Sequence, residues 1–213
     1  MRTLHAAPLV LPVGAAPVAD GALLVEGDRI AAIGPRAELT AAHPTARIRE
    51  WPGVLTPGLR QDAAAFLLRR CYFPDPREAE ALGTAPLTAE ATDALGADPA
   101  RRAAGVRRGL QQFLRYGTTV LALSPDPLLS PPVAKVGFAL TAPGSVTGSD
   151  PVALLDPLGG AASLASAVEA PLAVGDRADF AAFAVPDEES LLALGAGTCV
   201  ATVLAGRLLY RGR

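Results

Sequence analysis

The chain has 213 residues, of which 50% are hydrophobic and 19% are charged, and its formal net charge is −2. This composition is typical of a folded globular protein and argues against intrinsic disorder. The small negative charge excludes an overall field that would attract nucleic acid or an anionic membrane, so we expect neither as a partner.

The cysteines and prolines bear on the cellular compartment. Cys71 and Cys199 lie far apart and form no CXXC pattern, which indicates neither a disulfide framework nor a zinc knuckle. Prolines interrupt the apolar stretch near the N-terminus, and no uninterrupted apolar run reaches the roughly 18 residues that a membrane span needs. We therefore expect a cytoplasmic protein without a secretory signal or a membrane span.

The first 56 residues have the pattern of short strands separated by turns. Apolar segments at residues 3–7, 22–26 and 29–34 predict three strands, and Gly27 with Asp28 between the last two predicts a tight hairpin turn. A short helix at residues 37–42 and a strand at residues 46–51 are expected to follow.

The middle of the chain contains one clear helix. Asp98 is placed to cap it, Pro99 suits its first turn, and Gly117 is placed to end it. A buried strand is expected at residues 118–123 and one further strand at 134–140. The apolar stripe of the helix consists of Ala103, Val106, Leu110, Phe113 and Leu114, and its basic face, expected to be solvated or to meet an acidic partner, of Arg101, Arg102, Arg107, Arg108 and Arg115.

The C-terminal part again has a β pattern. The segment at residues 172–185 ends in an apolar strand, and residues 187–194 predict a helix. Residues 198–213 predict a final hairpin that turns at Gly206.

Four segments of the sequence carry a resemblance to a known family. VLTPGLRQDAAAF at residues 54–66 resembles the phrase VLTPGLVNAHTHL with which members of the amidohydrolase superfamily enter their barrel. DGALLVEGDRIAAIG at residues 20–34 is similar to the family's opening, and residues 172–185, with Gly175, Ala178 and Asp179, are similar to its closing phrase. Residues 108–122 resemble the family's second barrel helix and strand. Among the members of the family, the chain resembles imidazolonepropionase and aminodeoxyfutalosine deaminase most.

The resemblance implies an α+β fold in two parts. A small β-sandwich, the composite domain of the family, is expected to be built from both chain ends, residues 1–58 and 172–213. Residues 59–171 are expected to form a shortened α/β insert, a truncated barrel remnant, because a complete barrel alone takes about 250 residues.

The resemblance also implies a metal site, and the sequence lacks its ligands. The family's His-X-His pair falls on Ala63 and Ala65, and the only histidines of the chain are His5 and His43, both before the barrel entry. Since a catalytic zinc needs about three protein ligands, we expect no metal, and we expect no other cofactor.

Three residues remain as candidates for catalysis. Asp150 ends the segment VTGSD, which resembles the end of the family's last barrel strand, but it equally suits a turn. Asp62 lies beside the replaced histidines, where it is either a proton acceptor or a helix cap or surface carboxylate. Cys71 is either a nucleophile or an inert buried thiol.

Two functional hypotheses follow. The first is an amidohydrolase-like pseudoenzyme that serves as a binding or partner subunit. The apolar stripe of the helix in the middle of the chain is expected to be covered by a second copy of the chain or by a complete amidohydrolase. The binding of a small-molecule ligand is a further possibility. The second is a metal-independent hydrolase of carbon–nitrogen bonds other than peptide bonds, imidazolonepropionase- or deaminase-like, using Asp62, Cys71 or Asp150. The sequence leaves enzymatic activity open.

Overall fold

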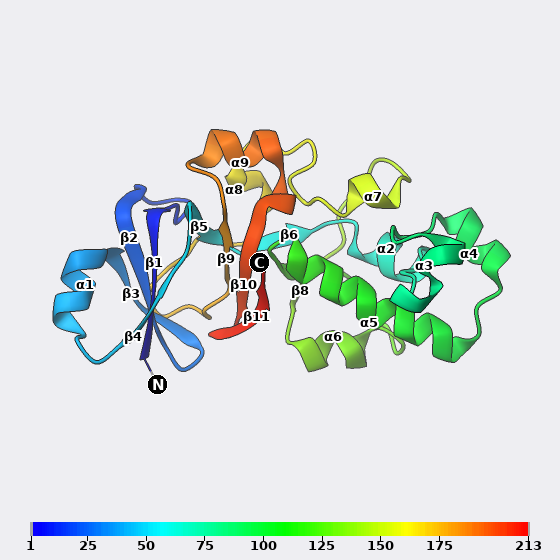
Figure 1. The fold of residues 1–213 in the computed structure, drawn as a ribbon, viewed down its shortest axis with the longest axis horizontal. Helices are drawn as coiled ribbons and strands as arrows, with labels where there is room; N and C mark the ends of the chain where they lie inside the picture. The colour runs from blue at the N-terminus through cyan, green and yellow to red at the C-terminus, as the bar shows by residue number, and fades with distance from the viewer. Residues whose placement is uncertain (1, 213) are drawn as a thin grey trace.

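A computed structural model describes residues 2–212 and divides their strands between two sheets. Figure 1 shows the strands from both chain ends on one side and in the middle, with the longest helix on the other side. The strands are β1 (Arg2–Val10), β2 (Val18–Glu26), β3 (Arg29–Pro35), β4 (Arg47–Glu50), β5 (Val54–Pro57), β6 (Leu59–Gln61), β7 (Thr118–Ala122), β8 (Ala139–Thr141), β9 (Phe180–Phe183), β10 (Cys199–Leu204) and β11 (Arg207–Arg211).

The larger sheet joins the two ends of the chain. Its order is β11-β10-β9-β5-β1-β2-β3, and β4 also pairs with β1. Most of its pairs are antiparallel, whereas β4 and β5 run parallel to β1. The joint between the chain ends is the antiparallel pair of β5 and β9, in which Pro57 lies opposite Phe180. The predicted turns at Gly27 and Gly206 are confirmed as those of the hairpins β2–β3 and β10–β11.

The two faces of the β1–β2 pair bury different side chains. Leu4, Ala6, Ala22 and Leu24 form a small core on the face that carries the helix α1 (Arg36–Ala42). On the opposite face, a larger core gathers residues from β1, β2 and β9–β11. Its main members are Ala7, Val10, Leu23, Val25, Ile30, Trp51, Leu55, Phe180, Ala182, Ala201 and Val203.

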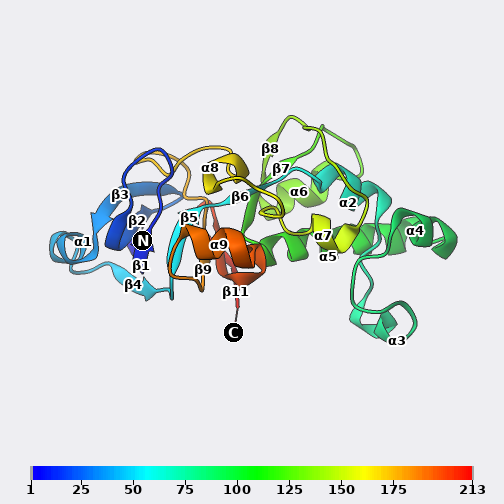
Figure 2. The same ribbon diagram turned by 90° about the horizontal axis from the view of Figure 1, so that it is seen from above.

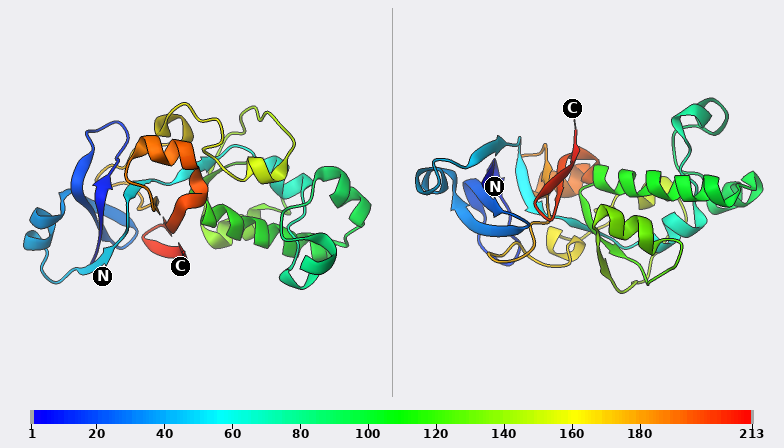
Figure 3. Two further views of the ribbon diagram at one scale, coloured as in Figure 1. Left: turned by 45° about the horizontal axis from the view of Figure 1, so that its top comes forward. Right: turned by 90° about the horizontal axis from the view of Figure 1, so that it is seen from below.

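The smaller sheet has three parallel strands in the order β6-β7-β8 and, within residues 2–212, forms no closed barrel. β7 is buried along its whole length. Figures 2 and 3 show α5 and α6 lying along this sheet, while α3 projects from the body. The helices are α1 (Arg36–Ala42), α2 (Ala64–Arg70), η1 (Pro76–Glu78), α3 (Ala79–Leu82), α4 (Ala89–Leu95), α5 (Pro99–Arg115), α6 (Ser130–Val136), α7 (Pro151–Leu154), α8 (Leu164–Ala167), α9 (Glu188–Leu194) and η2 (Ala196–Thr198).

The long helix α5 forms as its sequence predicts. The Asp98 carboxylate accepts the backbone N–H of Arg101, Pro99 occupies the first turn, and Gly117 follows the end with a φ of 71°. Leu110 and Phe113 are fully buried against α2 and β7. The C-terminal part of the stripe is therefore covered within the chain, whereas Val106 is half-buried and Ala103 is exposed. Association with a partner stays a prediction.

The structure corrects two expectations about the middle of the chain. Residues 134–136 belong to helix α6 and not to a strand, because Pro131 and Pro132 occupy the start of that helix and β8 begins only at Ala139. The basic face of α5 is also not simply solvated. Arg101 pairs with Glu78 at 2.6 Å and Arg108 with Asp75 at 3.3 Å, so these arginines hold the segment around η1 onto the helix.

The whole described chain, residues 2–212, contains no helix long and apolar enough to cross a membrane. Both chain ends contribute strands to one sheet, and the three-stranded sheet comes from residues between them. The exact boundaries at residues 58 and 172 remain predictions.

Candidate functional site

The site that the sequence points to begins where β6 ends. β6 stops at Gln61, Ala63 precedes the first turn of α2, and Ala65 is already helical. Residues two apart on a strand point to the same side, but on a helix they do not face one another. The two positions of the His-X-His motif therefore do not present their side chains together. Ala63 is buried and Ala65 half-buried, and both belong to or contact the core between α2, α5 and β7.

Gln61 explains how the end of β6 is fixed. Its side chain is buried, its amide N–H group donates to the carbonyls of Leu154 and Leu155 at 3.2 Å, and its carbonyl accepts the N–H of Ala63 at 2.9 Å. All of these partners are backbone groups, so Gln61 fastens α7 to the strand. Sequence reasoning missed this residue, although a polar side chain in a short buried strand is a usable signal.

Arg60 lies on β6 beside the lost motif and organises the charges there. Its Nε donates to Asp62 Oδ1 at 2.8 Å, and its Nη1 lies 3.5 Å from Glu169 Oε2. Thr141, at the end of β8, donates to Glu169 Oε1 at 2.9 Å. The hydrogen bond to Asp62 raises the pKa of the Arg60 guanidinium, with both carboxylates adding attraction. These four residues are called the Arg60 cluster below.

The Arg60 guanidinium is also tied to the backbone. It donates from Nη1 to the carbonyl of Val168 at 3.1 Å and from Nη2 to that of Ser166 at 3.2 Å. Its side chain is 26% exposed, against 46% for Asp62. The protein itself thus supplies a fixed positive charge, the Arg60 guanidinium, which pairs with the carboxylates at this end of β6.

The donor set does not fit the zinc or iron that the family resemblance implies. Within residues 2–212, no group of three or more His, Cys, Asp and Glu side chains is arranged to hold a metal ion. Catalytic zinc requires about three nitrogen, sulfur or oxygen ligands and an open position. Asp62 and Glu169 instead face a guanidinium, which donates hydrogen bonds and has no lone pair to offer a metal.

The three predicted catalytic residues lie in different environments. Asp62 belongs to the Arg60 cluster. Asp150 is exposed and caps the four-residue helix α7, where its carboxylate accepts the N–H of Val152 at 2.9 Å. Cys71 follows α2 and is buried. Among five pockets formed by the described residues, Cys71 lines one, and neither carboxylate lines any.

The pocket at Cys71 has a volume of about 520 Å³ and is mainly apolar. We call it the α2–α5 pocket; at its rim Arg69 pairs with Asp126 at 3.1 Å, and the exposed Leu128 lies beside it. Its other lining residues are Leu68, Tyr72, Thr92, Ala97, Pro99, Arg102, Ala103, Val106 and Leu129. The pocket offers an apolar surface with one charged edge.

The thiol of Cys71 is not prepared for nucleophilic attack. Burial raises its pKa to about 11, and burial likewise raises the pKa of Cys199 to about 11. Because the thiolate is the nucleophile, both thiols are protonated near neutral pH. This environment favours the inert-thiol interpretation of Cys71.

A pH series tests these thiols. Iodoacetamide is expected to alkylate Cys71 and Cys199 of the folded protein slowly at about pH 7.5, and the rate is expected to rise by about tenfold per pH unit toward pH 10, as the thiolate fraction grows. Mass spectrometry of the alkylated protein measures the rate at each cysteine. Urea-unfolded protein, with ordinary thiol pKa values, is the control and is expected to react rapidly. Fast alkylation of Cys71 in folded protein at neutral pH would contradict the prediction.

The barrel-entry phrase at residues 54–66 and the closing phrase at residues 172–185 meet in space. Gly58 donates its N–H to the carbonyl of Asp179 at 3.3 Å. The carboxylate of Asp179 accepts the N–H of Ala205 at 2.7 Å and lies 3.2 Å from Arg177 Nε. Burial raises the pKa of this carboxyl group. Asp179 therefore fixes the β10–β11 turn, a structural role.

The comparisons with known proteins agree with this architecture. Residues 21–46 match a family model described as the imidazolonepropionase-like composite domain of bacteria. This segment runs from β2 through β3 to the residues after α1, so it lies in the larger sheet. No curated protein matches the chain.

Solved structures similar to the chain are hydrolytic enzymes. They include an adenosine deaminase from Xanthomonas campestris with bound zinc (22% identical, 65% of this chain and 32% of that one, TM-score 0.47). A second is guanine deaminase from Bradyrhizobium japonicum, which is 19% identical, with 66% of this chain and 34% of that one covered and a TM-score of 0.46. A third is ochratoxinase from A. niger, which is 20% identical, with 68% of this chain and 32% of that one covered and a TM-score of 0.45. The chain spans about a third of the length of each, and at such low identity and TM-score these likenesses carry no inference about function. The family match confirms the predicted resemblance to the amidohydrolase superfamily, in the segment of its imidazolonepropionase-like composite domain at residues 21–46.

Proposed function

We propose that this chain is a non-catalytic, amidohydrolase-like binding protein. The observation that carries the proposal is the Arg60 cluster, in which a guanidinium neutralises Asp62 and Glu169 at the end of β6. The Arg60 guanidinium donates to both oxygens of Asp62, at 2.8 and 3.3 Å, and lies 3.5 Å from Glu169, so both carboxylates are engaged in holding the end of β6.

The α2–α5 pocket supports a binding role. Its volume of about 520 Å³ lies within the range of small-molecule sites, and such sites are lined mainly by apolar side chains with a few polar groups. A small apolar molecule fits this lining, because the charges of Arg69 and Arg102 are already paired with Asp126 and Asp93. Cys71 then serves as part of the apolar wall.

Metal content and turnover test the absence of catalysis. Protein purified without a histidine tag, incubated with excess zinc and desalted, is expected to retain far less than one zinc per chain by elemental analysis. It is also expected to hydrolyse imidazolonepropionate no faster than buffer. Near-stoichiometric zinc that is lost in the Asp62→Ala variant would contradict the proposal. So would turnover that is lost in Cys71→Ala or Asp150→Ala, which would favour the metal-independent hydrolase.

The binding part is tested on the same preparation. The apolar anionic dye anilinonaphthalene sulfonate is expected to bind saturably, and Val106→Trp is expected to weaken the binding at least about tenfold, because the larger ring fills the pocket. Arg107→Trp, which places the same ring on the exposed side of α5, is the matched control. Equal binding by wild type and both variants would remove the α2–α5 pocket from the proposal.

A further inference from the structure

A second pocket lies at the larger sheet, and its lining residues come from other parts of the chain than those of the α2–α5 pocket. It has a volume of about 360 Å³ and forms where the ends of β1 and β2 meet β4 and the β10–β11 turn. We call it the arginine pocket. Its lining residues are Thr3, Val25, Gly27, Arg49, Gly206, Arg207 and Leu208.

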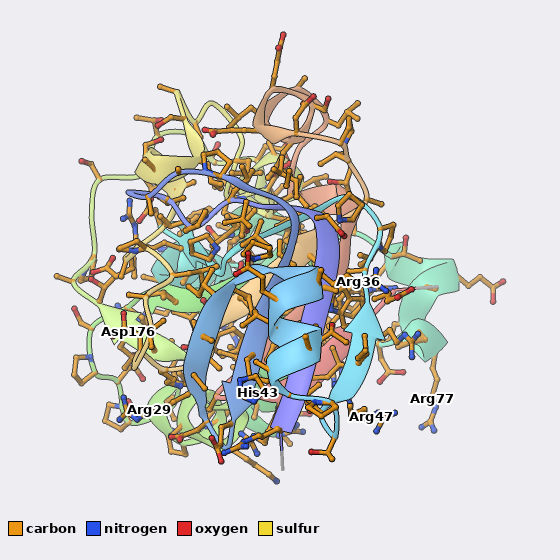
Figure 4. All side chains as sticks on the ribbon, turned by 90° about the vertical axis from the view of Figure 1, so that its left-hand side faces the viewer. Arg29, Arg36, His43, Arg47, Arg77 and Asp176 are labelled. Carbon is orange, nitrogen blue, oxygen red and sulfur yellow. The ribbon has the colours of Figure 1, made fainter. Side chains whose placement is uncertain are left out.

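The strand register directs two arginines of β4 to this side of the sheet. Arg47 lies opposite Thr3 and Arg49 opposite His5 in the parallel pair of β4 and β1. His5 is buried and packs its ring against Trp51 and Phe180 of the larger core. Since alternate residues of a strand point to one face, Arg47 and Arg49 share the face of His5. Figure 4 shows Arg47 at the start of β4.

A third guanidinium comes from the other end of the chain. Arg211 of β11 lies over the ring of Trp51, with 5.8 Å between the guanidinium carbon and the ring centre. Arg207 of the same strand lines the pocket and donates to the carbonyl of Val136 at 3.4 Å. Arg49 and Arg207, more than 150 positions apart in the chain, thus line the same pocket.

Three of these arginines have no carboxylate partner in the described part of the chain. Within residues 2–212, Arg47, Arg49 and Arg211 have no acidic partner within 4.0 Å, and the acids nearest to them along the strands are engaged elsewhere. Glu50 pairs with Arg36, and Glu26 pairs with Arg2. Burial lowers the pKa of Arg49, and repulsion from Arg47 and Arg211 lowers it further. The charged groups acting on Arg49 therefore have its own sign.

Guanidinium groups held together without counter-charges suit one class of ligand. An oxyanion offers several acceptor oxygens, matches the fork of a guanidinium and relieves the repulsion between neighbouring arginines. Half-buried Arg49 is partly removed from water, which strengthens its attraction for a bound anion. The volume of the arginine pocket accommodates a phosphate group together with part of the molecule that carries it.

We infer that the arginine pocket binds a small phosphate-bearing anion, with Arg49 and Arg207 lining the pocket and Arg47 and Arg211 adding positive charge near Arg49. This inference is independent of the α2–α5 pocket, and it places a ligand site in the sheet that the two chain ends build.

The single tryptophan of the chain reports on this site. Trp51 is the only Trp, and Arg211 contacts its ring face. Titration with inorganic phosphate at constant ionic strength is expected to change its fluorescence saturably, while chloride and acetate at the same ionic strength leave it unchanged. Phosphate is also expected to raise the melting temperature of the wild-type protein, because a ligand that binds only the folded state stabilises it.

Charge-neutral variants complete the test. Arg49→Gln and Arg207→Gln are each expected to weaken phosphate binding at least about tenfold, because each removes a charge-assisted hydrogen bond. Arg49→Lys is expected to retain part of the affinity. Arg107→Gln, which removes an exposed charge of α5, is the matched control and is expected to bind as the wild type does. Circular dichroism checks that each variant is folded.

Two results would overturn the inference. One is a response to phosphate that is linear and identical in wild type, Arg49→Gln and Arg107→Gln, which indicates general screening of charge. The other is the absence of both a fluorescence change and a thermal shift in the wild-type protein at millimolar phosphate.

Discussion

Replacing Gly58 by Ala is expected to destabilise the protein by at least about 3 kcal/mol, at the upper end of the cost of overpacking a core. A Cβ atom at this position would lie 2.0 Å from Thr119 Oγ1 and 2.5 Å from Thr119 Cβ. Thr119 is buried on β7, and its β-branched side chain has few alternative rotamers. The free energy of unfolding from urea titration measures the loss.

Gly34→Ala provides the matched control for this substitution. Gly58 lies between β5 and β6, and Gly34 lies in β3, where a Cβ atom meets nothing within 4 Å. This variant is expected to be neutral or slightly stabilising, because alanine restricts the unfolded chain more than glycine does. A Gly58→Ala protein as stable as Gly34→Ala would show that β6 and β7 move apart at little cost, and it would contradict the prediction.

Replacing Asp179 by Ala is expected to cost about 1–3 kcal/mol, because it leaves the part-buried backbone N–H of Ala205 without its acceptor. The Asp179 side chain is only 16% exposed and accepts the N–H of Ala205, a residue with the unusual φ of 49°. The substitution also removes the partner of Arg177. Urea titration and the near-ultraviolet circular dichroism of the folded state measure the effect.

Two variants of the same phrase are the controls for Asp179. Asp179→Asn is expected to cost less than the alanine variant, since an amide oxygen still accepts a hydrogen bond. Asp176→Ala is expected to change the stability by no more than about 0.5 kcal/mol, because Asp176 is exposed, as Figure 4 shows, and its contacts to Ile30 use the backbone. Equal losses at Asp176 and Asp179 would contradict a specific role of the Asp179 carboxylate.

Both predictions concern residues that lie in the phrases resembling the amidohydrolase superfamily. Gly58 allows β6 and β7 to approach closely, and Asp179 fixes the last hairpin. Each role is structural and requires no metal. Because these roles do not depend on a metal, the phrases still serve the fold in a chain that has alanines at the His-X-His positions.

The sequence predicted the elements whose signals lie within a few neighbouring residues. Asp98 and Pro99 mark the start of α5, and Gly27 and Gly206 mark the two hairpin turns. It also predicted that Ala63 and Ala65 supply no metal ligand, since that follows from residue identity alone. Capping, turn formation and ligand chemistry depend on a local group of atoms, so they can be read without coordinates.

Other features were decided only by the tertiary structure. The sequence did not show that Asp62 would pair with Arg60 or that Glu169, more than 100 residues away, would join them. Nor did it show that Arg49 would lie near enough to Arg47 and Arg211 to be repelled by their charges. Ion pairs and like-charge clusters depend on which strands become neighbours. A single charged residue carries no local signal of its distant partner, so the Arg60 cluster and the arginine pocket became visible only in the folded chain.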